Sequence, residues 1–274
     1  MQLKLFRHLW GMQGGIDVLF RQIKAAGYIG VEAGLPPPPQ REQFAAELKV
    51  HNLEFIGMIF SEGNDVAGHI ASFETQLQEI KAFQPAKVTA HSGRDEFDLN
   101  QARAFVQAAL KIEKQIGVTV GHETHRGRIF FNPWITRDLL AEFTDLKLTC
   151  DFSHWCVVAE RMTWDRKCPI GLYADRCIHL HSRVGYEQGP QVPDPAAPEY
   201  AAHLAISEGW WEQIWKSQQA RGVRESTLTP EFGPPGYLHT LPYTNVPVAD
   251  LVSVCDGMAE RELRRFNEMF SRSG

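Results

Sequence analysis

The feature that most constrains the fold of this chain is a regular alternation of short apolar runs with helical stretches. The runs recur about every 30 residues along a chain of 274 residues, and such alternation is typical of βα units that build a parallel sheet. Eight runs are present, at residues 3–7, 29–32, 54–59, 87–90, 118–123, 146–151, 176–181 and 228–231. Helical patterns separate them, for example at residues 16–26, 40–51, 69–83, 99–116 and 247–270.

Eight βα units without a break in composition predict one (β/α)8 TIM barrel, with residues 1–274 as a single domain. An open doubly wound sheet would instead need a glycine-rich phosphate loop after the first strand, and Gly11, Gly14 and Gly15 do not have that spacing. Two loops stand out. Residues 35–39 include four consecutive prolines and should be stiff and extended. Residues 182–198 form a long loop rich in glycine and proline, which we expect to act as a flap over an active site.

Composition excludes several classes of protein. The formal net charge of −5 argues against broad nucleic-acid binding, which needs clustered Lys and Arg. No apolar run approaches the roughly 18 residues that span a bilayer, and the N-terminus lacks the apolar segment of a signal peptide. Five cysteines without a CxxC pair indicate reduced thiols. We therefore expect a cytoplasmic protein with a small-molecule substrate and with neither a nucleic-acid nor a membrane partner.

Polar side chains end the last four predicted strands, at the edge where barrels of this kind build their active sites. They are Glu123, Asp151, His181 and Glu231. Residues two positions apart on a strand share a face, and the positions beneath these four are small or polar: Gly121, Thr149, His179 and Thr229. Burying three carboxylates without a cation would cost too much free energy. Three carboxylates and one imidazole suit Mn²⁺, Mg²⁺ or Co²⁺, with Zn²⁺ as an alternative.

The strand ends also carry motifs in a recognisable order. They read G-H-E-T-H, C-D-F-S-H, H-L-H and T-P-E-F-G, and this series resembles the xylose isomerase-like barrel superfamily. That group includes tagatose and psicose epimerases, hydroxypyruvate isomerase, inosose dehydratase and the apurinic endonucleases. The resemblance implies that Glu123, Asp151, His181 and Glu231 are metal ligands, that His154 contacts a substrate hydroxyl, and that the two glutamates form the acid–base pair.

Further candidates for substrate binding surround these motifs. In the sugar epimerases an Arg follows the histidine of strand 7 by six residues, whereas here Glu187 holds that position and the nearest arginine is Arg183. His91 ends the fourth strand and His125 follows Glu123 closely, so both are candidates for the pocket wall. For each of these residues, a supporting role behind the site or a place in a solvated loop is the plain alternative.

The resulting hypothesis is a metal-dependent sugar isomerase or epimerase that transfers a proton next to a carbonyl through a metal-stabilised enediolate. A dehydratase similar to inosose dehydratase is the main alternative. An apurinic endonuclease would need a D-x-H pair after strand 7 and a histidine near strand 3, and neither is present. A non-catalytic barrel would not need all four ligands. Barrels of this kind often dimerise, which makes the chain a candidate homo-oligomer.

Overall fold

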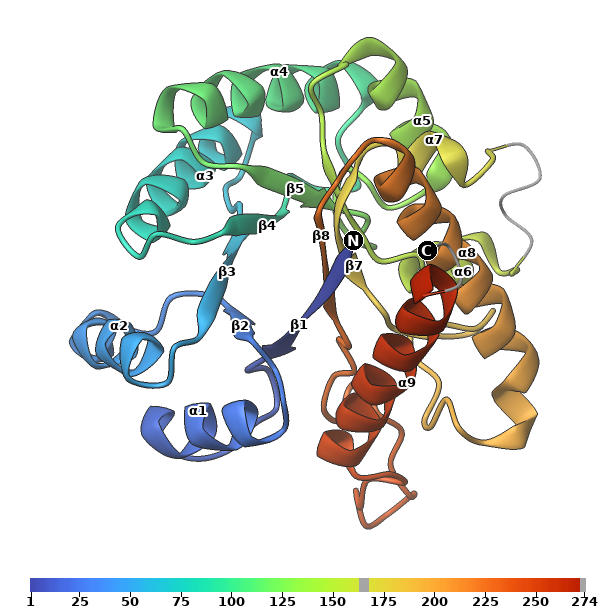
Figure 1. Cartoon of the computed structure of the whole chain (residues 1–274). Coiled ribbons are helices and arrows are strands. Elements are labelled where there is room, and N and C mark those ends of the chain that lie inside the picture. Colours follow the sequence, from blue (N-terminus) through green and yellow to red (C-terminus); the bar gives the residue numbers. More distant parts are fainter. Residues whose placement is uncertain (163–167, 272–274) are drawn as a thin grey trace.

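Eight parallel strands close into a barrel surrounded by helices, as Figure 1 shows. The computed structural model describes residues 1–162 and 168–271. Each strand pairs with the next along the chain, and β8 pairs with β1 to close the ring. The strands are β1 (Gln2–His8), β2 (Gly30–Ala33), β3 (Glu54–Phe60), β4 (Lys87–His91), β5 (Val120–Glu123), β6 (Leu148–Cys150), β7 (Cys177–His181) and β8 (Glu225–Thr229). The predicted (β/α)8 TIM barrel is confirmed.

The helices cover the outer surface of the barrel and connect successive strands. They are α1 (Ile16–Ala25), α2 (Arg41–Val50), α3 (Val66–Lys81), α4 (Leu99–Ile116), α5 (Pro133–Glu142), α6 (Ser153–Ala159), α7 (Gly171–Ala174), α8 (Ala201–Ala220) and α9 (Leu251–Ser271). The ends of α4 illustrate how sequence sets these bounds. Asp98 and Gln101 form a reciprocal capping box at its start, and Gly117 ends it with a left-handed φ of 76°. None of the helices in the described ranges is long and apolar enough to cross a membrane.

Several strand boundaries differ from the expected ones; β5 and β6, for example, each begin two residues later than expected. Two of the differences involve proline. The eighth strand begins at Glu225 and ends at Thr229, because Pro230 has no N–H to continue the ladder; Glu231 therefore lies two residues beyond it. The run of prolines was expected to be extended throughout. It is not, because Pro38–Gln40 forms a 3₁₀ turn. Proline is well tolerated in the first turn of a helix, where its missing N–H would have no partner.

The interior of the barrel is polar at both ends, with the ring of Phe6 between them. At the bottom, Lys4 Nζ pairs with Glu54 and Glu225 at 2.8 and 2.9 Å, and Lys87 Nζ donates to Thr227 Oγ1 at 3.0 Å. Phe6 is fully buried and packs so closely on β2 that a Cβ at Gly30 would lie 2.4 Å from its ring. Higher up, Thr89 Oγ1 lies 3.3 Å from Thr149 Oγ1, and His179 Nδ1 lies 2.8 Å from Thr227 Oγ1. His179 is thus a hydrogen-bonded histidine of the barrel interior, and the polar layer expected beneath the site is present.

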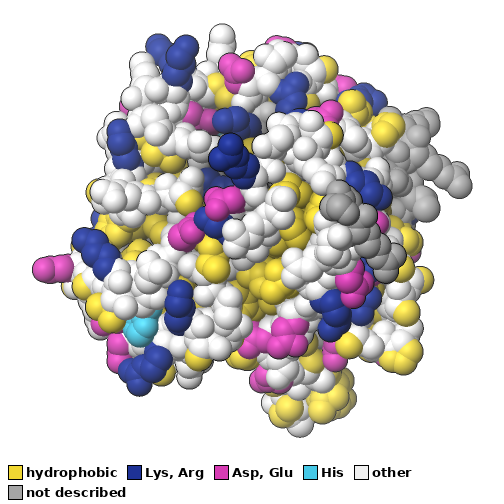
Figure 2. Space-filling view, viewed as in Figure 1, with side chains coloured by type: hydrophobic (Ala, Val, Ile, Leu, Met, Phe, Trp, Pro, Cys, Tyr) yellow, Lys and Arg dark blue, Asp and Glu magenta, His cyan; other side chains and the backbone are white. Residues whose placement is uncertain are grey.

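One segment projects beyond the body of the molecule. Residues 239–248, between β8 and α9, form a hairpin closed by a bridge between Thr240 and Pro247. Leu241, Tyr243 and Val246 are exposed on this hairpin. In Figure 2, apolar side chains gather on the part of the molecule that projects at the bottom of the view.

Candidate metal centre and the cavity above it

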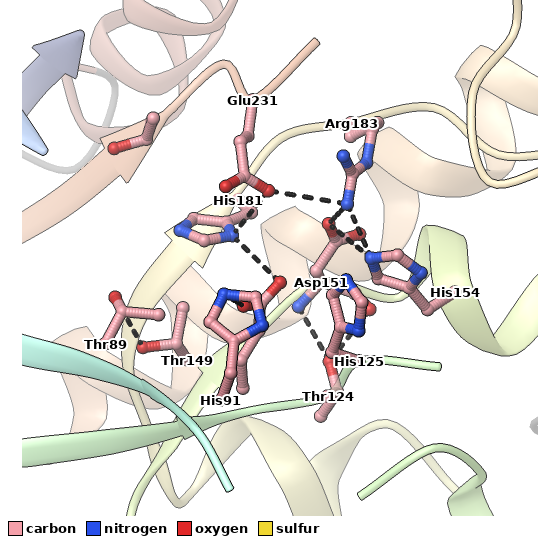
Figure 3. Close-up of polar contacts among 12 residues, drawn as sticks. Thr89, His91, Thr124, His125, Thr149, Asp151, His154, His181, Arg183 and Glu231 are labelled. Atoms are coloured by element: carbon pink, nitrogen blue, oxygen red, sulfur yellow. Dashed lines mark hydrogen bonds and ion pairs between the residues drawn. The ribbon is translucent and has the colours of Figure 1, made fainter. Parts of the chain in front are cut away.

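The structure brings all four predicted metal ligands together at the mouth of the barrel. Glu123 and His181 are the last residues of β5 and β7, Asp151 directly follows β6, and Glu231 follows β8 after one proline. All four are buried, and each offers a ligand atom within 4.8 Å of the others. Figure 3 shows Glu231, His181 and Asp151 converging from different strands. The set is able to hold a divalent cation.

The hydrogen bonding of these side chains fits a cation better than it fits a self-contained polar cluster. Both carboxylate oxygens of Glu123 are buried without a hydrogen-bond partner, and so is Nδ1 of His181. That Nδ1 faces Glu231 Oε2 at 3.1 Å and Glu123 Oε1 at 3.4 Å. Burial, together with the nearby glutamates, raises the pKa of Asp151 to about 6 in spite of the adjacent Arg183. An oxygen-rich, buried set with unsatisfied acceptors is the donor set of a hard divalent cation.

Glu32, at the end of β2, orients the histidine of this set from behind. Nε2 of His181 lies 3.1 Å from both carboxylate oxygens of Glu32. The same carboxylate accepts from Thr89 Oγ1 at 2.6 Å and lies 3.0 Å from His179 Nε2. A carboxylate behind a histidine ligand fixes the ring and directs its other nitrogen toward the metal. Sequence reasoning assigned Glu32 no role, although its place on the inward face at the end of a strand could have suggested one.

Arg183 places a positive charge beside the same carboxylates. Its Nη2 contacts the carboxylate of Asp151, donates to His154 Nε2 at 2.6 Å and lies 3.4 Å from Glu231 Oε2. Its guanidinium carbon lies 4.9 Å from the ring centroid of Tyr237. Nη1 is buried without a hydrogen-bond partner. Arg183 was expected to bind substrate, and the structure places it in the wall of the cavity above the ligand set.

The three histidines expected at the site take different positions. His91 and His125 both line the cavity. His91 Nε2 lies 2.7 Å from Glu123 Oε2, without the orientation of a hydrogen bond, and its ring stacks on Phe60. His154 is fully buried beneath His125, with ring centroids 3.9 Å apart. It is not among the residues that line the cavity in the described part of the chain, so its contacts here are with other side chains of the site.

Glu187 does not belong to this group. Tyr186 and Gly189 form two backbone hydrogen bonds with each other, of 2.9 and 3.2 Å, which turns the chain tightly between them. Glu187 lies in that turn, is partly exposed, and pairs with His203 on α8 at 3.0 Å. The expectation that it contacts substrate is not supported, because the turn directs its side chain toward α8.

The loop of residues 182–198 is held against the barrel and does not cover the site. Gln191 bonds both backbone groups of Gly233, donating to its oxygen at 3.1 Å and accepting from its nitrogen at 2.6 Å. Of the described residues in this loop, only Arg183 lines the cavity. The expectation that this loop acts as a flap over the site is therefore not supported by the described residues.

A cavity of about 580 Å³ opens above the ligand set. Glu32, His91, His125, Arg183 and Glu231 line it, whereas Glu123, Asp151 and His181 lie beneath these side chains, fully buried. The volume falls within the range of about 300–1,000 Å³ for small-molecule sites. The arrangement joins a candidate metal centre to a space that a small molecule can enter.

Comparison with protein-family models and with curated proteins finds no match for the chain. Solved structures do match. The 3-keto-D-glucoside 4-epimerase of E. coli has a TM-score of 0.61 and 14% identity, over 96% of this chain and 100% of that one. A xylose isomerase-like TIM barrel protein of Mycobacterium smegmatis in complex with magnesium has a TM-score of 0.57 and 12% identity, over 97% of each chain. A protein of Bacillus anthracis described as a probable 3-DHS dehydratase has a TM-score of 0.57 and 16% identity, over 85% of this chain and 94% of that one.

These neighbours are xylose isomerase-like TIM barrel proteins, as the strand-end motifs predict. The chain therefore has the fold of that group. At identities of 12–16% the likeness establishes the fold alone, since one fold hosts many reactions.

Proposed function

We propose that the protein is a divalent-metal-dependent isomerase or epimerase that acts on a sugar-like hydroxy-carbonyl compound by proton transfer. The observation that supports this most is the convergence of Glu123, Asp151, His181 and Glu231, with the acceptors of Glu123 unsatisfied. Glu231 lines the cavity, and the other three lie beneath its lining side chains. A divalent cation held by these residues would supply Lewis-acid stabilisation for the negative charge that develops on a carbonyl oxygen when the neighbouring proton is removed. Mn²⁺, Mg²⁺ and Co²⁺ fit the oxygen-rich set best, and magnesium is named in one structural neighbour.

Glu123 and Glu231 are the acid–base pair of this proposal. They come from β5 and from the end of β8, and both approach Nδ1 of His181, at 3.4 and 3.1 Å. Glu231 lines the cavity directly, while His91 lies between the cavity and Glu123. One glutamate removes the proton from the carbon next to the carbonyl, and the other returns a proton to the neighbouring carbon or to the opposite face.

Arg183 has the substrate-positioning role. Its Nη1 has no hydrogen-bond partner although the side chain is buried, and the residue lines the cavity beside Glu231. A guanidinium donor there binds an anionic or carbonyl oxygen of the substrate and holds it over the acid–base pair. His125 offers a second polar contact from the cavity wall.

Two other reactions use related barrels. A dehydratase would begin with the same proton abstraction and then expel a hydroxyl group, so the assay must also detect loss of water. An endonuclease needs a wide basic surface for the phosphate backbone. The net charge of −5 disfavours that reaction, and acidic and basic side chains are interspersed over the face shown in Figure 2.

The test is solvent exchange with the metal-loaded protein. Wild type in D₂O with a panel of ketoses should incorporate deuterium next to the carbonyl of one substrate, followed by mass spectrometry and NMR. Glu123→Gln and Glu231→Gln, each verified to hold metal, should lose turnover by about 10²-fold or more, as expected for a positioned acid–base group. Glu113→Gln is the matched control. Glu113 Oε1 pairs with His122 Nε2 at a distance of 2.9 Å, and Glu113 does not line the cavity. Full turnover in metal-loaded Glu→Gln proteins would remove both glutamates from the acid–base role.

A further inference from the structure

The mouth of the barrel has two halves of different chemistry. The ends of β5 to β8 carry the carboxylates, His181 and Arg183, whereas the ends of β1 and β3 carry large apolar side chains. Met58 and Phe60 are two residues apart on β3 and so share a face, and both line the cavity. Trp10, two residues after the end of β1, also lines it. The side of the cavity away from the ligand set is therefore an apolar wall.

This apolar wall is extensive for a site that would receive only a sugar. It is formed by Leu9, Trp10, Ile16, Phe44, Met58 and Phe60. Trp10 remains 42% exposed and Phe60 37% exposed, so these rings keep apolar surface that a ligand can cover. The polar residues on the same side are His8, Glu32, Gln40 and Arg128. The carboxylate of Glu32 already pairs with His179 and His181, and Arg128 Nη1 donates to the backbone oxygens of Ser61 and Gly93.

The physical chemistry of this wall disfavours a fully hydroxylated ligand. Hydroxyl groups pressed against Met58 and Phe60 would lose water without gaining hydrogen bonds, which costs free energy. An apolar group in the same place would gain the free energy of burial instead. Opposite this wall, Glu231 and Arg183 provide the polar contacts that an oxygen-bearing group needs.

We propose that the natural substrate carries an apolar substituent of about the size of an aromatic ring beside its hydroxy-carbonyl group. The hydroxy-carbonyl group faces Glu231 and Arg183, and the substituent packs against Trp10, Met58 and Phe60. This inference rests on the proposed function for the polar half of the cavity and specifies its substrate class: a hydroxy-ketone attached to an apolar body, rather than a free sugar.

Two probes with the same head group test this inference on the full chain loaded with Mn²⁺. Hydroxyacetone and 2-hydroxyacetophenone share the α-hydroxyketone, and a phenyl ring replaces a methyl group in the second. Calorimetry should show the phenyl probe binding more tightly by about 10–100-fold, the gain expected from burying a ring of this size. Equal affinity for both probes would overturn the inference while leaving the proposed function in place.

Variants of the apolar wall then locate the effect. Met58→Gln keeps the length of the side chain but adds a polar amide, and should reduce the preference for the phenyl probe at least threefold without changing hydroxyacetone binding. Met269→Gln on α9, outside the cavity, is the matched control. Phe60→Gln is the second variant, and its partial exposure makes misfolding a small risk. An unchanged preference in both Met58→Gln and Phe60→Gln would also overturn the inference.

The same titrations with EDTA separate this inference from the proposed function. With the metal removed, the phenyl probe should retain measurable binding through the apolar wall, whereas hydroxyacetone should lose its binding. Binding of the phenyl probe that is the same with and without metal would support the apolar wall and contradict the metal-dependent function. Failure of both probes to bind the metal-loaded protein would overturn the inference.

Discussion

Glu32→Gln tests whether the carboxylate behind His181 tunes the metal centre. In the wild type, Nε2–H of His181 donates to Glu32 at 3.1 Å, which leaves Nδ1 free to face the other carboxylates. An amide at position 32 can present an NH₂ group to the same ring nitrogen. The ring then carries its proton on Nδ1, the nitrogen that would bind the metal, and each metal-binding event must first reverse that tautomer.

The expected loss follows from this geometry. Glu32 also accepts from Thr89 at 2.6 Å and lies 3.0 Å from His179 Nε2, so the rest of its network holds the amide in place rather than letting it rotate away. Loss of such a carboxylate typically weakens metal binding by about 10–100-fold, which corresponds to about 1.4–2.8 kcal/mol. The four candidate ligands themselves stay unchanged in this variant, and the cavity wall changes only where Glu32 lines it.

Free Mn²⁺, followed by its electron paramagnetic resonance signal during titration, measures the affinity of each protein. Glu113→Gln is again the matched control, since Glu113 pairs with His122 in the same chemistry outside the site. Its affinity should equal that of the wild type. If Glu32→Gln binds Mn²⁺ as tightly as the wild type does, the carboxylate does not control the histidine ligand and the reasoning fails.

Two further predictions concern stability. Removing the metal with a chelator should lower the melting temperature by roughly 5 °C relative to protein at about one hundred times the Kd, and Mn²⁺ or Mg²⁺ should restore it; an unchanged melting curve after verified removal would count against a metal centre. Glu262→Gln on α9 should stabilise the protein by roughly 1–3 kcal/mol at pH 8 and by nothing near pH 4, because burial and the neighbouring Glu208 raise the pKa of Glu262 to about 9. The wild type loses that stability as the pH rises from the ordinary pKa range of a glutamate toward 9. Urea unfolding at several pH values should therefore show a difference in free energy of unfolding, between Glu262→Gln and the wild type, that grows with pH.

The barrel and the convergence of the four candidate ligands could be predicted from the sequence because both depend on local rules. Strand positions follow from short apolar runs, and the inward face of each strand follows from the two-residue period. Glu123 and His181 end their strands as expected, and Asp151 follows its strand by one residue. Even the error at the eighth strand left Glu231 at the mouth, because the shift by two residues preserved the face on which it lies.

The features that sequence reasoning missed depend on contacts between distant parts of the chain. The loop after β7 is held against the barrel by the side chain of Gln191 and the backbone of Gly233, 42 residues away. No local sequence pattern predicts that pairing, so the loop was expected to act as a flap. Similarly, the ring of His154 on α6 is buried against that of His125, which follows β5, with the two rings tilted by 47°. A sequence motif identifies the type of residue at a position. Whether that residue reaches the cavity depends on its neighbours in space.

The place of the arginine at this site follows from the same two-residue period once the end of β7 is known. His179, His181 and Arg183 are successive inward positions, so the chain carries its side chains from the barrel interior to the ligand set and then to the cavity wall. An arginine two residues after the histidine, at the start of the loop, reaches Asp151 and Glu231. Glu187 lies beyond a tight turn, where the strand period no longer applies. Arg183 lies at the start of the loop, and contacts with Asp151, His154 and Tyr237 hold its guanidinium in place before a ligand enters. Under the proposed function, this preorganisation would reduce the entropy lost when an oxygen of the substrate binds there.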